Sequence, residues 1–305
     1  MGHARVVVLG SLPALGHELL GQRFAVETGG QPAGAAAIVT DPSIPVTADL
    51  LDEAGTSLEV VANFGVGYDN IDLDAARARG IRVTNTPGVL TNATAELAVA
   101  LMLAAARRIA EADAAVRAGQ WERAAADQPI GRELSGATVG LVGFGRIGRR
   151  VAELLRGFEV RLLATSRSSG APSPGVERLE LLDLLGASDF VSVHVPLAPE
   201  TRHLIDANAL AAMKGGAILV NTSRGGVVDT TALIHALRSG HLGAAGLDVY
   251  EDEPHVPADL RDLRNTVLLP HVGSATATTR DAMAQLCAEN VIAVLDGRDP
   301  LTAVV

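Results

Sequence analysis

Short apolar runs recur along the chain and alternate with segments that suit helices. The runs are continuous in valine, isoleucine, leucine and alanine, which is typical of parallel strands buried on both faces. They fall into two series, one in the N-terminal third and one beginning near residue 137. The first series comprises 5–10, 35–40, 58–65 and 81–85, and the second comprises 137–142, 159–165, 189–195, 217–221, 243–249 and 266–270.

The segments between these runs predict helices. Residues 46–55 and 70–80 separate strands of the first series, and 230–240 separates strands of the second. Asp229 suits the N-cap of the last of these helices, and Gly240 suits its C-terminal stop. Alternating strands and helices predict an α/β fold, and two such series predict two Rossmann-like, doubly wound parallel-sheet domains.

The segment 91–121 lies between the two series and predicts a helix, with Thr91 or Asn92 available to cap it. Leu97 and Leu101 belong to an i, i+4 apolar row, but other faces of the helix are apolar too. A helix that is apolar most of the way round is buried on several sides. We therefore expect a central core helix or a part of a subunit interface.

Composition narrows the classes of function. The 305 residues suggest about two domains. Hydrophobic residues make up 48% and the net charge is −10, which favours a globular protein and argues against non-specific nucleic-acid binding. Cys287 is the only cysteine, so neither an intramolecular disulfide nor a cysteine metal site is expected.

The N-terminal residues predict no export signal. Residues 1–10 lead directly into a strand, without the charged and then long apolar profile of a signal peptide. No uncharged apolar run reaches the roughly 18 residues that a membrane-spanning helix needs. We expect a soluble, cytoplasmic protein with no membrane partner.

The stretch 140-GLVGFGRIG-148 carries the first candidate chemistry. Gly143, Gly145 and Gly148 follow a predicted strand and open a predicted helix, which is the context of the dinucleotide fingerprint. The first glycine permits the turn, the second lets the backbone approach a pyrophosphate, and the third lets helix and strand pack closely. The motif predicts a dinucleotide site; the alternative is a glycine-rich turn without a ligand.

The residues after the next strand bear on the choice of cofactor. NAD-binding folds carry an acidic residue about 20 positions beyond the glycines, where it binds the ribose hydroxyls. Residues 163–170 contain no carboxylate and offer Thr165, Ser166 and Arg167 instead. Hydroxyls and a guanidinium suit a 2′-phosphate, so the stretch predicts a preference for NADP(H). The alternative is a solvated polar loop.

Three candidate catalytic groups follow three predicted strands, at the edge of the sheet where α/β folds bind ligands. A guanidinium (Arg224), a carboxylate (Glu253) and an imidazole (His271) there would suit carboxylate binding and proton transfer. Each also has a structural interpretation, because a single arginine can lie in a surface turn and a single histidine can be structural. The residues alone do not choose among Glu251, Asp252 and Glu253.

These motifs, in this order, resemble the D-2-hydroxyacid dehydrogenase family over nearly the whole chain, and most closely its glyoxylate/hydroxypyruvate reductases, with the branch active on hydroxyphenylpyruvate. The matching stretches are 63-NFGVGYDNID-72, 81-IRVTNTPGVLTNATAELA-98, 140-GLVGFGRIG-148, 193-VHVPLAPETRHLI-205, 220-VNTSRGGVVD-229, 246-GLDVYEDEP-254 and 268-LLPHVGSAT-276.

The resemblance implies a role for each matching residue. Arg224 would bind the substrate carboxylate and carbonyl, His271 would donate the proton, and Glu253 would be its partner and raise the imidazole pKa. The backbone N–H groups of Val66 and Gly67 would hold the substrate carboxylate. Asp248 would lie near the nicotinamide carboxamide. The full set of expected cofactor contacts is Thr94, Gly143, Phe144, Gly145, Arg146, Ile147, Gly148, Thr165, Ser166, Arg167, His194, Pro196, Thr201, Thr222, Ser223 and Asp248.

The resemblance also implies the organisation of the chain. Residues 1–93 and 276–305 would form a discontinuous, flavodoxin-like substrate domain, with the NAD(P)-binding domain inserted as residues 94–275. The helix at 92–110 would contribute to a homodimer. One departure concerns residues 118–131, where Trp121 stands alone in place of a tryptophan-rich stretch, so the pocket mouth is expected to be wider.

The sequence therefore predicts an NADPH-preferring 2-oxoacid reductase that also accepts NAD(H), acts on glyoxylate and hydroxypyruvate, and holds no metal. Alternatives within enzymes are an aromatic, phenylpyruvate-type reductase and an NAD-linked 3-phosphoglycerate dehydrogenase. An alternative outside enzymes is a non-catalytic, NAD(H)-sensing interaction protein, similar to the C-terminal-binding-protein corepressors. The intact arginine, glutamate and histidine favour an enzyme.

Overall fold

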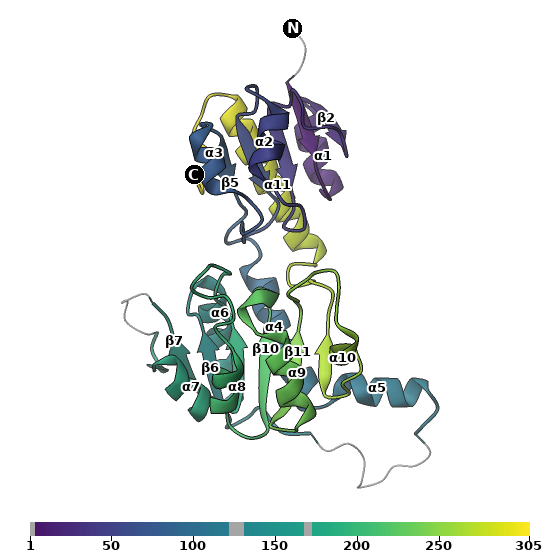
Figure 1. Cartoon of the computed structure of the whole chain (residues 1–305), viewed down its shortest axis with the longest axis vertical. Coiled ribbons are helices and arrows are strands. Elements are labelled where there is room, and N and C mark those ends of the chain that lie inside the picture. The colour runs from purple at the N-terminus through teal and green to yellow at the C-terminus, as the bar shows by residue number, and fades with distance from the viewer. Residues whose placement is uncertain (1–3, 122–130, 168–172) are drawn as a thin grey trace. The chain divides into compact units, whose positions relative to one another are not determined.

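The computed structural model describes residues 4–121, 131–167 and 173–305. The chain forms two compact units (Figure 1). The first comprises the residues up to Leu90 together with Ser274–Val305, and the second comprises Thr91–Gly273. Each unit is built around one parallel sheet.

The first unit has a five-stranded parallel sheet in the order β2-β1-β3-β4-β5. Buried valines and isoleucines of β1, β3 and β4 form its core together with apolar residues of α2 and α3. Thr302 ties the C-terminal tail to this unit, because its hydroxyl donates to the Asn85 carbonyl at 2.6 Å. The elements are β1 (Arg5–Val8), α1 (Ala14–Gly21), β2 (Ala25–Thr28), β3 (Ala37–Thr40), α2 (Ala48–Ala54), β4 (Val60–Asn63), α3 (Leu73–Ala78), β5 (Arg82–Thr84) and α11 (Ala277–Leu295).

The second unit has a seven-stranded parallel sheet in the order β12-β11-β10-β9-β6-β7-β8. Its strands are β6 (Thr138–Val142), β7 (Arg161–Thr165), β8 (Val176–Arg178), β9 (Phe190–Val193), β10 (Ala217–Asn221), β11 (Leu242–Leu247) and β12 (Thr266–Leu268). Its helices are α4 (Thr91–Ala106), α5 (Ile109–Arg117), α6 (Arg146–Leu155), η1 (Arg156–Phe158), α7 (Leu181–Ala187), α8 (Ala207–Ala212), η2 (Gly225–Val227), α9 (Thr230–Arg238) and α10 (Ala258–Arg261).

Helices cover both faces of this sheet (Figure 1). One core joins α4 and α6 to the sheet, and the other joins α7, α8 and α9 to it. Strands buried on both sides explain the continuous apolar runs in the sequence. The prediction of an α/β fold with two doubly wound parallel sheets is confirmed.

Two strands have no counterpart among the predicted runs. β2 and β8 each lie at an edge of their sheet, and most of their residues are exposed. An edge strand has only one neighbour and needs fewer apolar residues, so its sequence carries no continuous run. The sequences AVET and VER therefore lack the continuous apolar run that indicates a buried strand.

The single helix predicted over 91–121 is interrupted after Ala106, because α4 ends there and α5 is a separate helix. Arg108 between them adopts a left-handed conformation with φ 53°. The physical reason lies in the returning chain: the Arg132 N–H donates to the Ala106 carbonyl at 2.9 Å. That carbonyl is consequently not used by a further turn of helix.

Candidate active site

The centre of the second unit is its topological switch point. The chain runs from β6 outward through β7 and β8, then returns to β9 on the other side of β6. Loops leaving β6 and β9 therefore diverge, which creates the crevice where α/β sheets bind ligands. The Gly143 N–H donates to the Thr165 carbonyl at 3.0 Å, so the glycine turn lies directly beside the end of β7.

The backbone requires glycine at two of the three positions of this turn, and the third leaves open space. Gly143 has φ +99°, a conformation that other residues rarely adopt. A Cβ on Gly148 would lie 2.3 Å from the Gly143 carbonyl oxygen, so only glycine permits this contact between helix and strand. Gly145 is the N-cap of α6, and no atom lies within 4 Å of a Cβ built there.

The open space at Gly145 lies at the N-terminus of α6, a ten-residue helix that has no side-chain cap. Unpaired N–H groups and the positive end of the helix dipole favour phosphate groups at such a position. Two buried polar atoms nearby in the fold, Thr222 Oγ1 and His194 Nε2, have no hydrogen-bond partner within the described part of the chain. Buried polar atoms normally have partners, so these two suit the polar atoms of a bound ligand. The residues fit a dinucleotide.

His194 makes the unit sensitive to acid. Burial lowers the pKa of its imidazole to about 4. Below the ordinary imidazole pKa near 6.5, His194 is protonated in the unfolded chain but stays neutral in the folded chain. Stability should therefore fall with pH below about 6.5, by about 2 kcal/mol at pH 5.

Urea unfolding of wild type and His194→Gln at pH 7 and pH 5 measures this loss. The variant should lose about 2 kcal/mol less than wild type between the two pH values. Equal losses in the two proteins would show that His194 does not carry the acid sensitivity.

The polar residues after β7 are engaged with charged partners. Arg167 forms an ion pair with Glu200, with Nη1 and Oε1 2.6 Å apart. The Ser166 carbonyl accepts a hydrogen bond from Arg178. Glu200 was not predicted as a site residue, because it belongs to the loop after β9 and is 33 residues distant in sequence.

The candidate catalytic residues lie in three loops at the carboxyl ends of neighbouring strands. Arg224 follows β10, Glu253 follows β11, and His271 follows β12. The structure brings two of them into direct contact, because His271 Nδ1 lies 2.7 Å from Glu253 Oε2. Both side chains remain about one-third exposed. The contact engages Nδ1 and leaves Nε2 as the nitrogen that can meet a substrate.

The surroundings of Glu253 keep it ionised. Burial favours its protonated form, and the hydrogen bond and charge of His271 oppose burial. The Tyr250 N–H, 2.9 Å from Oε1, and the nearby Arg224 charge act in the same direction. The pKa of Glu253 therefore lies below its usual range, and a carboxylate is available to hold the imidazole N–H.

Tyr250 joins the three loops and was missed by the sequence reasoning. A Cβ on Gly225 would lie 1.8 Å from the Tyr250 carbonyl carbon, so the loop of Arg224 packs backbone to backbone against the loop of Glu253. The Tyr250 hydroxyl donates to the Leu269 carbonyl at 2.9 Å, two residues before His271. The glycine at 225 and the aromatic residue at 250 are the only signals in the sequence.

Asp248 holds the turn that carries His271. Its carbonyl accepts the His271 N–H at 2.9 Å, and its carboxylate accepts the N–H groups of Val272 at 2.7 Å and Gly273 at 2.8 Å. Three successive amides thus converge on one residue, an arrangement that binds anions. Burial nevertheless raises the pKa of the Asp248 carboxyl. His271 itself has φ 54° in this turn.

Several of the predicted contact residues have their polar groups engaged locally. The Thr94 hydroxyl donates to the Gly273 carbonyl at 3.1 Å. Thr201 Oγ1 donates to the Pro196 carbonyl at 2.7 Å and thereby shapes the loop after β9. The Ser223 hydroxyl donates to Asn221 at 2.8 Å. These contacts build the loops, and the expected contacts with a cofactor stay predictions.

Two further predictions concern the loop after β4 and the stretch 118–131. The carbonyls of Val66 and Gly67 accept hydrogen bonds from Asn85 at 2.8 Å and Asn63 at 2.7 Å. These two amides hold the loop after β4, and the expected role of its N–H groups stays a prediction. The stretch 118–131, where a wider pocket mouth is predicted, falls mostly outside the described residues, which resume at Gly131.

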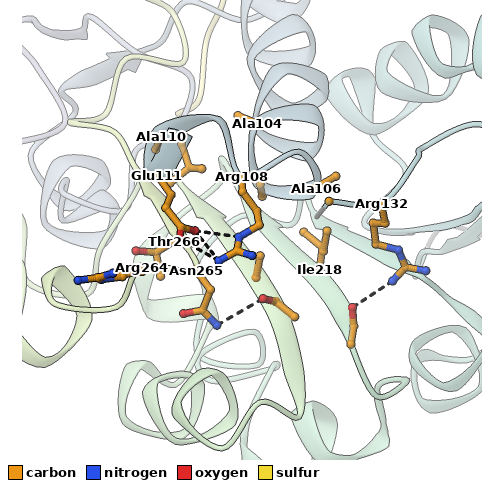
Figure 2. Close-up of a pocket in the computed structure, with 16 residues that line it drawn as sticks. Ala104, Ala106, Arg108, Ala110, Glu111, Arg132, Ile218, Arg264, Asn265 and Thr266 are labelled. Atoms are coloured by element: carbon orange, nitrogen blue, oxygen red, sulfur yellow. Dashed lines mark hydrogen bonds and ion pairs between the residues drawn. The ribbon is translucent and has the colours of Figure 1, made fainter. Parts of the chain in front are cut away.

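A hollow of about 330 Å³ lies elsewhere in the second unit, where α4 meets α5 (Figure 2). It is lined by Gly216, Gly243 and Thr266, which lie at the amino ends of β10, β11 and β12. Arg108 crosses it to pair with Glu111, at 2.7 Å. The candidate catalytic residues follow the carboxyl ends of the same strands, so this hollow is not their site.

Within residues 4–121, 131–167 and 173–305, no helix combines the length and the apolar character needed to span a membrane. The same ranges contain no group of three or more histidine, cysteine or acidic side chains arranged to hold a metal ion.

Comparisons with known proteins identify the family. The model of the D-isomer specific 2-hydroxyacid dehydrogenase NAD-binding domain matches residues 99–273. The glyoxylate reductase of Thermococcus kodakarensis is 45% identical, and the match covers 98% of this chain and 96% of the relative.

Solved structures similar to this chain include proteins of the same family and activity class. A protein of Thermus thermophilus has a TM-score of 0.93 at 45% identity, covering 99% of this chain and 100% of the other. The NADPH-dependent glyoxylate/hydroxypyruvate reductase of Sinorhizobium meliloti, solved with NADP and malonate, has a TM-score of 0.92 at 36% identity, covering 100% and 97%. With the glycine turn and the paired histidine in place, the chain belongs to the D-isomer-specific 2-hydroxyacid dehydrogenases, which are NAD(P)-dependent oxidoreductases acting on 2-hydroxy acids.

Proposed function

We propose that the protein is an NADPH-preferring reductase of small 2-oxoacids, with glyoxylate and hydroxypyruvate as its substrates. The observation that carries the proposal is the His271–Glu253 pair, which lies beside the Arg224 charge at the carboxyl edge of the sheet. The names of the relatives from Thermococcus kodakarensis and Sinorhizobium meliloti support both the substrate class and the cofactor.

Arg224 binds and polarises the substrate. Its planar guanidinium can hold a carboxylate and the adjacent carbonyl through paired, charge-assisted hydrogen bonds. These bonds strengthen as negative charge develops on the carbonyl oxygen, so they favour the transition state over the bound substrate. The backbone N–H groups of Val66 and Gly67 are further proposed partners of the substrate carboxylate.

His271 supplies the proton. The ionised Glu253 accepts the Nδ1 hydrogen bond and holds the ring in place, and the protonated imidazole donates from Nε2 to the carbonyl oxygen. Bound at the glycine turn, a nicotinamide cofactor supplies the hydride. Reduction requires a protonated His271, so reduction weakens at alkaline pH and oxidation of the hydroxy acid weakens at acidic pH.

Initial rates with purified protein test the proposed function directly. NADPH and NADH are each supplied with glyoxylate, hydroxypyruvate and phenylpyruvate. We expect the highest kcat/KM with NADPH and one of the two small oxoacids. A preference for phenylpyruvate would favour the aromatic reductase, and no turnover with any oxoacid would contradict the proposal.

We also propose that the protein is a homodimer, and that the interface predicted at the helix 92–110 extends along α5. Among its side chains Ile109 and Val116 are exposed, by 52% and 56%, and none of its residues is buried. Trp121, four residues beyond the helix, is exposed by 60%. Large apolar side chains gathered on an exposed element mark an interaction site.

The double variant Ile109→Glu, Val116→Glu should therefore sediment as a monomer while the wild type sediments as a dimer. Charged residues buried in an apolar interface would be unpaired and costly. The same substitution at the exposed Leu182 of α7 is the control and should leave the dimer intact. A dimeric double variant would exclude α5 from the interface.

A further inference from the structure

The loop after β9 brings a carboxylate to the cofactor edge of the sheet. β9 and β7 flank β6 in the sheet, so the loops that follow them lie on either side of the glycine turn. Glu200 from the first loop pairs with Arg167 from the second at 2.6 Å. The stretch after β7 has no acidic residue of its own, yet the folded unit places one beside it.

The two partners of this ion pair suit different cofactors. A carboxylate accepts hydrogen bonds from the two free hydroxyls of the adenosine ribose, as in NAD(H). A guanidinium binds a 2′-phosphate through charge-assisted hydrogen bonds, as in NADP(H). A 2′-phosphate near Arg167 competes with Glu200 for that guanidinium and also meets the negative charge of Glu200.

We propose that Glu200 is a specificity-determining residue, which accepts hydrogen bonds from the ribose hydroxyls of NAD(H) and opposes the 2′-phosphate of NADP(H) by competing for Arg167. The inference rests on the proposed binding of a dinucleotide at the glycine turn. On this proposal the chain accommodates both cofactors. Arg167 stays paired with Glu200 when NAD(H) binds, and pairs with the 2′-phosphate when NADP(H) binds. Glu200 thus supplies the acidic ribose partner that the sequence lacks after β7.

The energetics permit such an exchange. The hydrogen bond from Arg167 lowers the pKa of Glu200, so the carboxylate is charged at neutral pH. The side chains are 72% and 53% exposed. An exposed ion pair contributes little stability, so opening it for a ligand costs little.

Titration calorimetry of NADP⁺ and NAD⁺ binding to wild type and Glu200→Gln tests the proposal without turnover. The neutral glutamine neither repels a phosphate nor neutralises Arg167. We expect the Kd of NADP⁺ to fall about fivefold and the Kd of NAD⁺ to rise about threefold, at low ionic strength. The gain for NADP⁺ should shrink in 0.5 M salt, because screening weakens the repulsion.

Glu177→Gln is the matched control. Glu177 pairs with Arg161 at 2.6 Å, with exposures of 50% and 56%, at the amino end of β7. This variant should change neither Kd. Thermal unfolding of both variants verifies that the fold is intact.

The outcomes separate this inference from the proposed function. A wild type that binds NAD⁺ more tightly contradicts the NADPH preference, whereas the inference still requires Glu200→Gln to shift the ratio of the two Kd values. An unchanged ratio overturns the inference whichever cofactor the wild type prefers. Equal weakening of both cofactors also overturns it, because it assigns Glu200 a merely structural role.

Discussion

Replacing His271 with asparagine should lower kcat for oxoacid reduction by about 10²- to 10⁴-fold, the usual contribution of a positioned general acid. Asparagine is the informative change because residue 271 has φ 54°, a conformation that asparagine tolerates better than alanine. The Kd of NADPH should change less than about twofold, since the imidazole is assigned to the substrate. Single-turnover kinetics and fluorescence titration measure the two quantities.

The chain contains a matched control for this change. His203 pairs with Glu251 at 2.9 Å, its side chain is 38% exposed like that of His271, and its φ is 49°. His203→Asn therefore removes the same kind of pair from the same kind of backbone, one loop away. We expect it to retain most of the turnover. If His271→Asn retains as much, His271 is not the proton donor.

Replacing Arg224 with glutamine should lower kcat/KM for the oxoacid by about 10³-fold, which corresponds to about 4 kcal/mol of transition-state stabilisation. Glutamine cannot supply the charge or the paired N–H groups of a guanidinium. Lysine keeps the charge but lacks the fork, so Arg224→Lys should recover only part of the loss. The effect should appear in kcat/KM for the oxoacid, with binding of NADPH nearly unchanged.

Arg264→Gln serves as the control for the loss of a charge. Arg264 lines the hollow at the amino ends of the strands (Figure 2), whereas the candidate catalytic residues follow the carboxyl ends. Its rates should match those of the wild type. An Arg224→Lys variant as active as wild type would contradict paired binding, and an active Arg224→Gln variant would contradict any substrate role for Arg224.

The parts of the fold that are buried on both faces could be predicted from the sequence. Strands such as β6 and β10 consist almost wholly of buried residues, and burial leaves a continuous apolar run. The edge strands β2 and β8 leave no such run. The end of α4 at Ala106 depends on a hydrogen bond from Arg132, 26 residues later, which no local pattern records.

The location of the candidate site could be predicted from the sequence, but the pairing of its residues could not. The strand that precedes each of Arg224, Glu253 and His271 places them at one edge of the sheet, because parallel strands share a carboxyl edge. Spacing could not choose among three neighbouring acidic residues. In the structure Glu253 pairs with His271, and Glu251 pairs with His203. Glu200 pairs with Arg167 from a loop 33 residues away in the sequence. The two loops are brought together by the strand order of the sheet, which the sequence does not give.

A crystal structure with NADPH and oxamate, an unreactive analogue of a 2-oxoacid, tests the central claim most directly. The account predicts that the carboxylate and the amide carbonyl oxygen of oxamate lie within hydrogen-bond distance of the Arg224 guanidinium. His271 Nε2 should lie within about 3 Å of that carbonyl oxygen, with Nδ1 still on Glu253. Oxamate bound away from these two side chains, with the nicotinamide in place, would contradict the account.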